Sequence, residues 1–381
     1  MSQHPRVPLS VLDLAVVPAG GTGPQAVRAA VDLAVDLDRL GYRRVWYAEH
    51  HLSPGVGSAS PAVLAAAVAA RTERIRVGSG AVLLSTTSPL VAAEQFGTIA
   101  ALHPGRVDLG LGRAFTPPGG TKDAAPADTA PAAPTPAAAR PAFGPRVVDG
   151  LYVPGAPPID GSDSVLRERL LAQKRVVGAS RTPAAFRDEL GLVLGLRAGD
   201  YAEADGTRHV APPVEGADFD LWVLASSAGE SARVAGELGL PIAANFHVSP
   251  ATTLDTIAAY RAAFRPGVLD RPYVVVSADV LVAATTAEAR ALAAPFADWV
   301  LSIRRGAAGA VAYPHPDDAV PWAARDADEL LITTATHDPA DTRRSFALLA
   351  EAWGVAPGAE APPAADAAPA GADRAALTLV P

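Results

Sequence analysis

Three polar residues, Glu49, His50 and His51, follow directly after a short apolar segment at residues 45–48. Residues 27–40, which precede this apolar segment, have apolar side chains at helical spacing and are followed by Gly41. This pattern is expected for a helix that ends at a left-handed glycine. The order helix, turn, strand, polar cluster is typical of folds that present reactive side chains at the carboxyl ends of parallel strands. A carboxylate beside two imidazoles can bind a metal ion or move protons near neutral pH.

Other histidines follow other predicted strands, with His247 after the sixth and His337 after the eighth. A metal site is disfavoured because no His-x-His pair follows the first strand and no His-Glu-x-x-His helix is present. A serine hydrolase is disfavoured because Gly78-Ser79-Gly80 lacks the Gly-x-Ser-x-Gly frame. The third interpretation is acid/base support of a bound organic cofactor, which suits a histidine with a pKa of about 6.5. His337 can instead be a simple loop donor.

A candidate anion site lies between the fifth predicted strand and the next helix. Residues 224–231 join that strand to a helix over 232–238, so backbone N–H groups and the hydroxyls of Ser227 and Ser231 face outward at a helix amino end. Arg113, directly after the fourth strand, offers a second anion contact on the same face. Serine-rich helix caps and surface arginines also occur for purely structural reasons, so these residues alone leave both interpretations open.

The rest of the chain supplies the elements that position these residues. Helices over 62–71 and 90–102 follow the pairs Ser60-Pro61 and Ser88-Pro89, in which a hydroxyl caps the helix and proline occupies its first turn. Eight nearly continuous apolar strands that alternate with helices predict an α/β protein, a (β/α)8 TIM barrel, with a doubly wound open sheet as the alternative. The eight strands are expected at residues 9–17, 43–48, 75–84, 106–112, 219–225, 241–246, 273–283 and 330–334.

Composition predicts one large domain with two irregular segments. A chain of 381 residues with 49% hydrophobic content is long enough to bury a sizeable core, which we assign to a single domain over residues 1–355. Stretches rich in Ala and Pro at 116–145 and 356–381 show no periodicity. We expect the first to be a disordered insertion after the fourth strand and the second a disordered tail.

Charge and residue usage exclude several classes of function. The net charge is −8 and no cluster of Lys and Arg resembles a nucleic-acid footprint. Cysteine is absent, which excludes disulfides, thiolate metal sites and cysteine nucleophiles. Residues 1–8 contain no apolar signal segment, and no run approaches the roughly 18 apolar residues of a membrane helix. We therefore expect a cytoplasmic protein that binds neither nucleic acid nor membranes.

Four segments of the first third carry a recognisable pattern. They read GYRRVWYAEHH at 41–51, IRVGSGAVLL at 75–84, SPLVAAEQF at 88–96 and LHPGRVDLGLGRA at 102–114. In this order they resemble the bacterial luciferase-like flavin-dependent monooxygenases of the FMN type. The resemblance covers residues 9–114 and resumes over about 219–305 and 328–353.

The resemblance implies a luciferase-like barrel that binds FMN at the carboxyl ends of its strands. His50 matches the residue that acts as acid or base in the family, with Glu49 and His51 as its neighbours in the catalytic site. The positions that match the family's flavin contacts are Ser79, Gly80, Ala81, Arg113, Ser227 and Ser231. The first three match a strand segment that lies against the isoalloxazine ring, often with a cis bond between the last two.

The reaction implied is oxygen transfer from a C4a-peroxyflavin, formed from FMNH2 and O2, to a small organic substrate of unspecified identity. No Gly-x-Gly-x-x-Gly unit is visible, so a separate NAD(P)H-flavin reductase is expected to supply the reduced flavin. A homodimer is also expected. The alternatives are a deazaflavin-dependent dehydrogenase on the same barrel and a non-catalytic flavin-binding partner subunit.

Two segments depart from the family pattern. The tract at 116–145 replaces an insertion that normally carries phosphate and substrate contacts. Residues 312–327 are shorter than the usual helix before the last strand, which predicts a truncated seventh helix.

Overall fold

The computed structural model describes residues 7–113, 144–148, 151–155, 164–177, 185–296, 299–300, 303, 310–313 and 329–353. Eight parallel strands close into a barrel because β3 pairs with β2 on one side and with β5 on the other. In their order around the barrel they are β1 (Leu9–Asp13), β2 (Arg44–Tyr47), β3 (Arg76–Ser79), β5 (Val107–Gly112), β8 (Phe219–Ala225), β9 (Ile242–Asn245), β10 (Val274–Asp279) and β11 (Glu329–Thr333). The predicted (β/α)8 barrel is confirmed and the open sheet is excluded.

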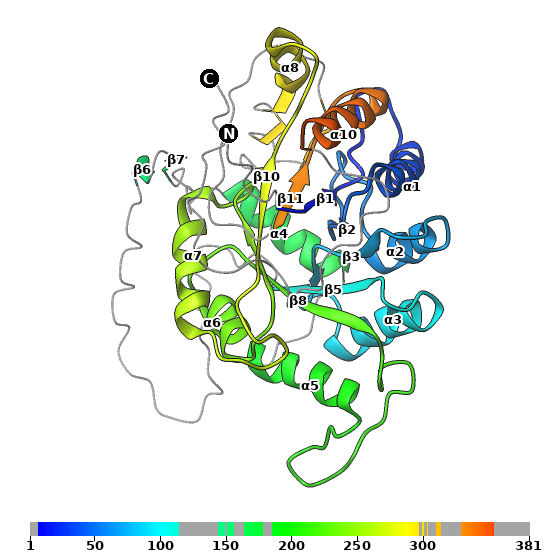
Figure 1. Cartoon of the computed structure of the whole chain (residues 1–381), viewed down its shortest axis with the longest axis vertical. Coiled ribbons are helices and arrows are strands. Elements are labelled where there is room, and N and C mark those ends of the chain that lie inside the picture. Colours follow the sequence, from blue (N-terminus) through cyan, green and yellow to red (C-terminus); the bar gives the residue numbers. More distant parts are fainter. Residues whose placement is uncertain are drawn as a thin grey trace.

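Helices surround this barrel, as Figure 1 shows. The outer ring contains α1 (Gly23–Leu40), α2 (Pro61–Ala69), α3 (Pro89–Leu102), α5 (Phe186–Ala198), α6 (Glu230–Glu237), α7 (Pro250–Ala263) and α10 (Pro339–Trp353). Shorter additions are β4 (Val82–Leu83), the hairpin of β6 (Arg146–Val148) and β7 (Leu151–Val153), and the helices α4 (Ser164–Val177) and α8 (Thr286–Ala293). Among the described helices, none is long and apolar enough to cross a membrane.

All eight predicted strands are present, although several end earlier than expected. The last turn of α1 closes at Gly41 with φ 86°, as the sequence predicts. The Ser88 side chain accepts a hydrogen bond from the Val91 N–H at 3.2 Å, which confirms that cap. Ser60 is the N-cap residue of α2 and Pro61 its first residue, as predicted, but the Ser60 side chain makes no capping bond.

Three expectations fall on residues that the structure leaves undescribed. The insertion expected at 116–145 lies outside the described residues except for Gly144 and Pro145. The expected tail at 356–381 also lies outside them, as does the shortened segment at 312–327 except for Ala312 and Tyr313. The hairpin and α4, which lie between β5 and α5, were not predicted, because the sequence there has weak periodicity.

Alternating side chains divide the apolar residues into two layers. Those pointing outward from the strands, such as Val11, Val45 and Val77, pack against the surrounding helices. Those pointing inward fill the barrel, where the rings of Trp46 and Trp222 meet edge to face with centroids 5.0 Å apart. Because both faces are buried, the strands read as continuous apolar runs.

A buried carboxylate at the amino-terminal end of the barrel interior links side chains from neighbouring strands. Asp108 on β5 is fully buried and accepts hydrogen bonds from Arg44 at 2.7 Å, from Trp46 at 2.9 Å and from Arg76 at 2.7 Å. Arg76 also reaches Asp220 on β8 at 2.7 Å. Burial alone would raise the pKa of Asp108, but Arg44 and Arg76 more than offset it and hold the pKa below its ordinary value. One charge network therefore joins β2, β3, β5 and β8.

Removing this carboxylate is expected to destabilise the protein strongly. Asp108→Ala leaves the buried Arg44 guanidinium without its counter-ion, which costs about 3–5 kcal/mol in comparable buried pairs. The free energy of unfolding in urea, measured at pH 7, gives this loss. Asp36→Ala on the exposed face of α1 is the matched control and is expected to change it by less than about 1 kcal/mol. Equal stability of the Asp108 variant and the control would contradict the central role of this network.

Candidate active site at the mouth of the barrel

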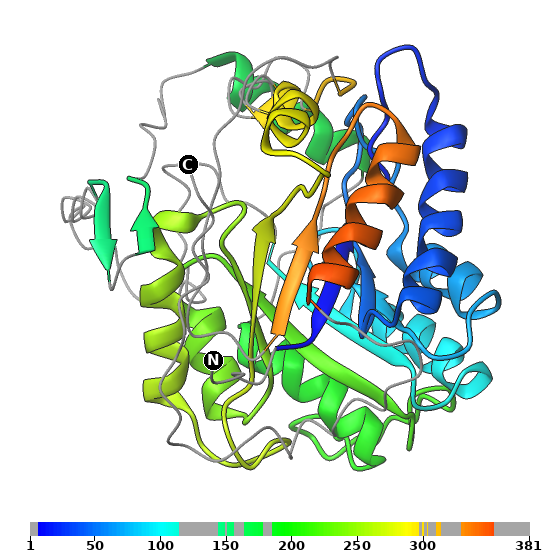
Figure 2. The same cartoon turned by 45° about the horizontal axis from the view of Figure 1, so that its top comes forward.

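The carboxyl ends of the strands form the mouth of the barrel, the end toward which β10 and β11 point in Figure 2 and beyond which α8 lies. In the loop after β2, Glu49 is only 7% exposed and fixes the loop at this end of the barrel. Its carboxylate accepts from the Leu83 N–H at 2.9 Å and the Thr86 hydroxyl at 2.6 Å, and bonds to His51 at 2.8 Å. Gln173 of α4 donates to the His51 carbonyl at 2.5 Å. Glu49 and His51 therefore hold two loops and a helix together.

His50, between these two residues, differs from both. Its imidazole makes no hydrogen bond to any side chain or backbone group that the structure describes. The residue is exposed to solvent, yet burial among surrounding protein atoms is the largest cause of its lowered pKa. His50 is therefore accessible to solvent while protein atoms surround it, at the carboxyl end of β2.

His247 joins His50 from the opposite part of the sequence. Its Nδ1 bonds to the Ser277 hydroxyl at 2.6 Å. Burial, with a smaller contribution from a charge on His50, lowers the pKa of His247 to about 4. His50 follows β2 and His247 follows β9, and this charge coupling means that the two imidazoles lie within electrostatic reach of each other. His337 instead bonds to the Ala19 carbonyl at 3.1 Å, the loop-donor role.

No three His, Asp or Glu side chains come close enough to hold a metal ion in the part of the chain that the structure describes.

The segment after β3 lies between His50 and β5. The bond between Gly80 and Ala81 is cis, as the sequence comparison predicts. Ser79 is fully buried, and its hydroxyl donates to the Gly110 carbonyl at 2.9 Å while accepting from the Gly110 N–H at 3.0 Å. The Ser79 side chain thus serves the packing of β3 on β5, and its hydroxyl does not face the mouth. Ala81 belongs to the apolar cluster inside the barrel.

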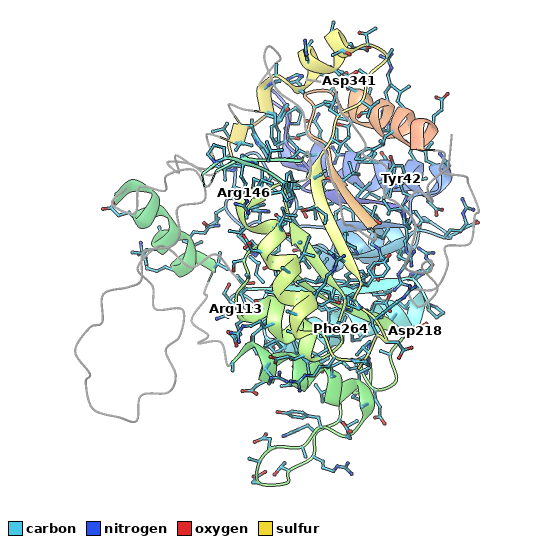
Figure 3. The ribbon with its side chains drawn as sticks, turned by 60° about the vertical axis from the view of Figure 1, so that its left-hand side comes forward. Tyr42, Arg113, Arg146, Asp218, Phe264 and Asp341 are labelled. Carbon is cyan, nitrogen blue, oxygen red and sulfur yellow. The ribbon has the colours of Figure 1, made fainter. Side chains whose placement is uncertain are left out.

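The candidate anion site forms at the amino end of α6. The N–H groups of Glu230, Ser231 and Ala232 and the hydroxyls of Ser227 and Ser231 have no hydrogen-bond partner among the described residues. Arg113, labelled in Figure 3, reaches the same place from the end of β5. Arg113 therefore lies at the start of the helix that follows Ser227, on the face where the sequence predicts it.

A carboxylate also occupies this site, and the sequence analysis missed it. Glu230, the first residue of α6, forms an ion pair with Arg113 and accepts from the Phe186 N–H at 3.2 Å. Its position at a helix start, where acidic residues are common, gave no sign of the second partner, because Arg113 lies 117 residues away. Glu230 neutralises the charge that would attract an anion.

The comparison with known proteins identifies the family. The luciferase-like monooxygenase family model matches residues 7–132 and 172–352. The uncharacterized protein YvbT of Bacillus subtilis (strain 168) is 32% identical over 380 residues, which cover 91% of this chain and 96% of YvbT. The chain belongs to the luciferase-like monooxygenase family, which confirms the resemblance stated above.

Solved structures agree with this assignment. The crystal structure of apo-MsnO8 has a TM-score of 0.68 at 28% identity, over 92% of this chain and 99% of that one. The oxygenating constituent of 3,6-diketocamphane monooxygenase from Pseudomonas putida, a type II Baeyer-Villiger monooxygenase in complex with FMN, has a TM-score of 0.57 at 17% identity. That likeness covers 94% of this chain and all of the other, and at this identity it shows the fold alone.

The lowered pKa of His247 predicts a specific loss of stability in acid. An unfolded histidine has a pKa of about 6.5, whereas that of His247 in the fold is about 4. Between these values the unfolded state binds more protons, so stability is complete above about pH 6.5 and declines as the pH falls toward 4. His247→Asn is expected to make the decline in urea midpoint between pH 7 and 4.5 shallower. An equally steep decline would show that His247 is protonated normally in the fold.

Proposed function

We propose that the protein is an FMN-dependent monooxygenase that uses FMNH2 and O2 to oxygenate a small organic substrate. The observation that carries the proposal is the placement of His50, without a side-chain partner, and of the anion site at α6 on the same end of one barrel. Membership in a monooxygenase family supports it, as does a protein of the same fold that holds FMN. When bound, reduced flavin supplies the activation of O2 and the transfer of one oxygen atom.

The residues of the anion site fit the phosphate of FMN. Free N–H groups at the start of α6, together with the hydroxyls of Ser227 and Ser231, match the acceptor oxygens of a phosphate monoester. Arg113 adds a charged donor. Gly80, Ala81 and the apolar residues inside the barrel would hold the ring system of the flavin.

His50 is the proposed acid/base residue of the mouth. Its imidazole is neutral near pH 7, and no residue that the structure describes bonds to its ring nitrogens, so it can take or give a proton. Glu49 and His51 position it from both sides through their bonds to each other and to the neighbouring loops. Below it, Trp46 and Trp222 close the barrel and exclude water from the reacting groups.

Two further parts of the proposal concern partners. A separate NAD(P)H-flavin reductase supplies the reduced flavin, and the chain acts as a homodimer in the cytoplasm. Contact through α2 and α3 would cover Val63, Leu90 and Val91, which are 69%, 38% and 43% exposed. Aliphatic side chains exposed in one region are suited to such an interface.

Replacing His50 by Ala is expected to leave FMN binding nearly unchanged and to slow oxygenation about 10²- to 10⁴-fold, because proton transfer loses its carrier. The assay supplies FMNH2 through a flavin reductase and follows the gain of one oxygen atom, by mass spectrometry, in a panel of small aldehydes, thioethers and amines. His103→Ala, at the end of α3, is the matched control and should react at the normal rate. An unchanged rate in the His50 variant would remove this residue from the mechanism.

Replacing Glu230 by Gln is expected to tighten FMN binding about 1.4- to 5-fold, since an exposed ion pair of this kind contributes roughly 0.2–1 kcal/mol. Glutamine keeps an oxygen for the Phe186 N–H but releases Arg113 to the phosphate. Arg113→Ala is expected to weaken binding. Fluorescence titration with FMN measures the dissociation constant of the wild type and of the two variants. Weaker binding by the Glu230 variant would mean that this residue orients Arg113 for the phosphate and does not compete with it.

A further inference from the structure

A second carboxyl group faces the mouth, and the proposed oxygenation chemistry makes no use of it. Asp279 is the last residue of β10, where it lies opposite Thr333 of β11. Side chains alternate along a strand, so Val275, Ser277 and Asp279 share one face. Val275 belongs to the cluster that fills the barrel. Asp279 therefore points inward at the carboxyl end of the strand. The sequence analysis missed it because the predicted strand ran on to residue 283.

Asp279 is half-buried, and its carboxylate has no hydrogen bond and no ion pair with any residue that the structure describes. A carboxylate partly enclosed by protein without a partner loses part of its hydration without compensation. Burial raises the pKa of Asp279 to about 8. The side chain is therefore largely protonated at neutral pH until a cation arrives.

Two oxygen atoms near Asp279 also lack partners. Tyr313 is fully buried, and its hydroxyl has no hydrogen bond among the described residues. Burial, and to a smaller extent the charge of Asp279, raises the pKa of Tyr313. Its backbone is held at the mouth by bonds to Val17 and Ala19 in the loop after β1. On the adjoining strand, Asn245 lies opposite Ser277 and its buried Oδ1 is unpartnered. The Asp279 carboxylate, the Tyr313 hydroxyl and Asn245 Oδ1 therefore lie on one wall of the mouth without a hydrogen-bond donor among the described residues.

The charges around this wall favour a cation. His50 and His247 both have lowered pKa values and are neutral at pH 7. Glu49 is paired with His51, and Arg113 with Glu230, so neither basic side chain serves Asp279. An anionic ligand would find no positive partner on this wall among the described side chains. A primary ammonium group has three N–H donors and one charge, which matches three acceptor oxygens that include one carboxylate.

We propose that the wall formed by Asp279, Tyr313 and Asn245 binds the protonated amino group of a small apolar amine, with Asp279 as its counter-ion. An alkylamine has a pKa near that of lysine, about 10.4. It therefore keeps its proton while Asp279 gives up its own, and the two charges pair inside the mouth. The alkyl chain would extend over the apolar residues at the top of the barrel interior. Calling the amine a substrate rests on the proposed function, whereas its binding does not.

The experiment is isothermal titration of the full chain with n-hexylamine, without flavin, at pH 6.5, 7.5 and 9. The wild type is expected to bind more tightly as the pH rises, because Asp279 must lose a proton. Asp279→Asn is expected to bind about 10- to 100-fold more weakly at pH 9, the usual loss for a charged hydrogen bond, and with no dependence on pH over this range. Asp205→Asn, on an exposed turn, is the matched control and should bind as the wild type does.

Circular dichroism of the Asp279 variant separates loss of binding from loss of the fold. Tyr313→Phe provides a second variant, expected to weaken hexylamine binding by a smaller factor because it removes one neutral acceptor. Equal affinity of wild type and Asp279→Asn, or no binding of hexylamine by the wild type, would overturn the proposal. Failure of FMN to bind in separate titrations would contradict the monooxygenase function and leave the amine site standing.

Discussion

Asp108 imposes the constraint on which the rest of the structure depends. Its carboxylate is fully buried and bonds to Arg44, Trp46 and Arg76 from two neighbouring strands. A buried charge is tolerated only with such complete pairing, so β2, β3 and β5 must keep the register in which these side chains meet. Glycine is required close by, because a Cβ at Gly78 would come within 2.3 Å of the Asp108 carbonyl oxygen. The network fills the amino end of the barrel and leaves the opposite end for chemistry.

The mouth divides into two parts with different electrostatics. On the side of β5 and α6, donors gather around Arg113 and the start of α6. On the side of β9 and β10, acceptor oxygens gather around Asp279. A phosphate-bearing cofactor on the first side and an amine on the second would bring the two reactants together above Trp46 and Trp222. The charge of Arg113 on the donor side is balanced by Glu230.

The sequence predicted the barrel well because its strands are buried on both faces and so read as apolar runs. It also predicted that Arg113, Ser227 and Ser231 would meet, since positions after parallel strands converge. Contacts between residues far apart in the sequence could not be predicted. Neither the ion pair of Glu230 with Arg113 nor the hydrogen bond of Thr86 to Glu49 leaves a periodic signal in the sequence. The hydroxyl of Ser79 shows the same limit, because only the approach of Gly110 on β5 reveals that it is occupied.

The central claim is that this barrel end takes reduced FMN. Anaerobic titration of the full chain with FMNH2 and, in parallel, with the reduced deazaflavin coenzyme tests it most directly. We expect FMNH2 to bind saturably, at one per chain, and the deazaflavin to bind much more weakly. Added inorganic phosphate is expected to weaken FMNH2 binding, because it competes for the start of α6. Binding of the deazaflavin alone would contradict the account and assign the protein to hydride transfer, and binding of neither would mark it as a subunit without a flavin of its own.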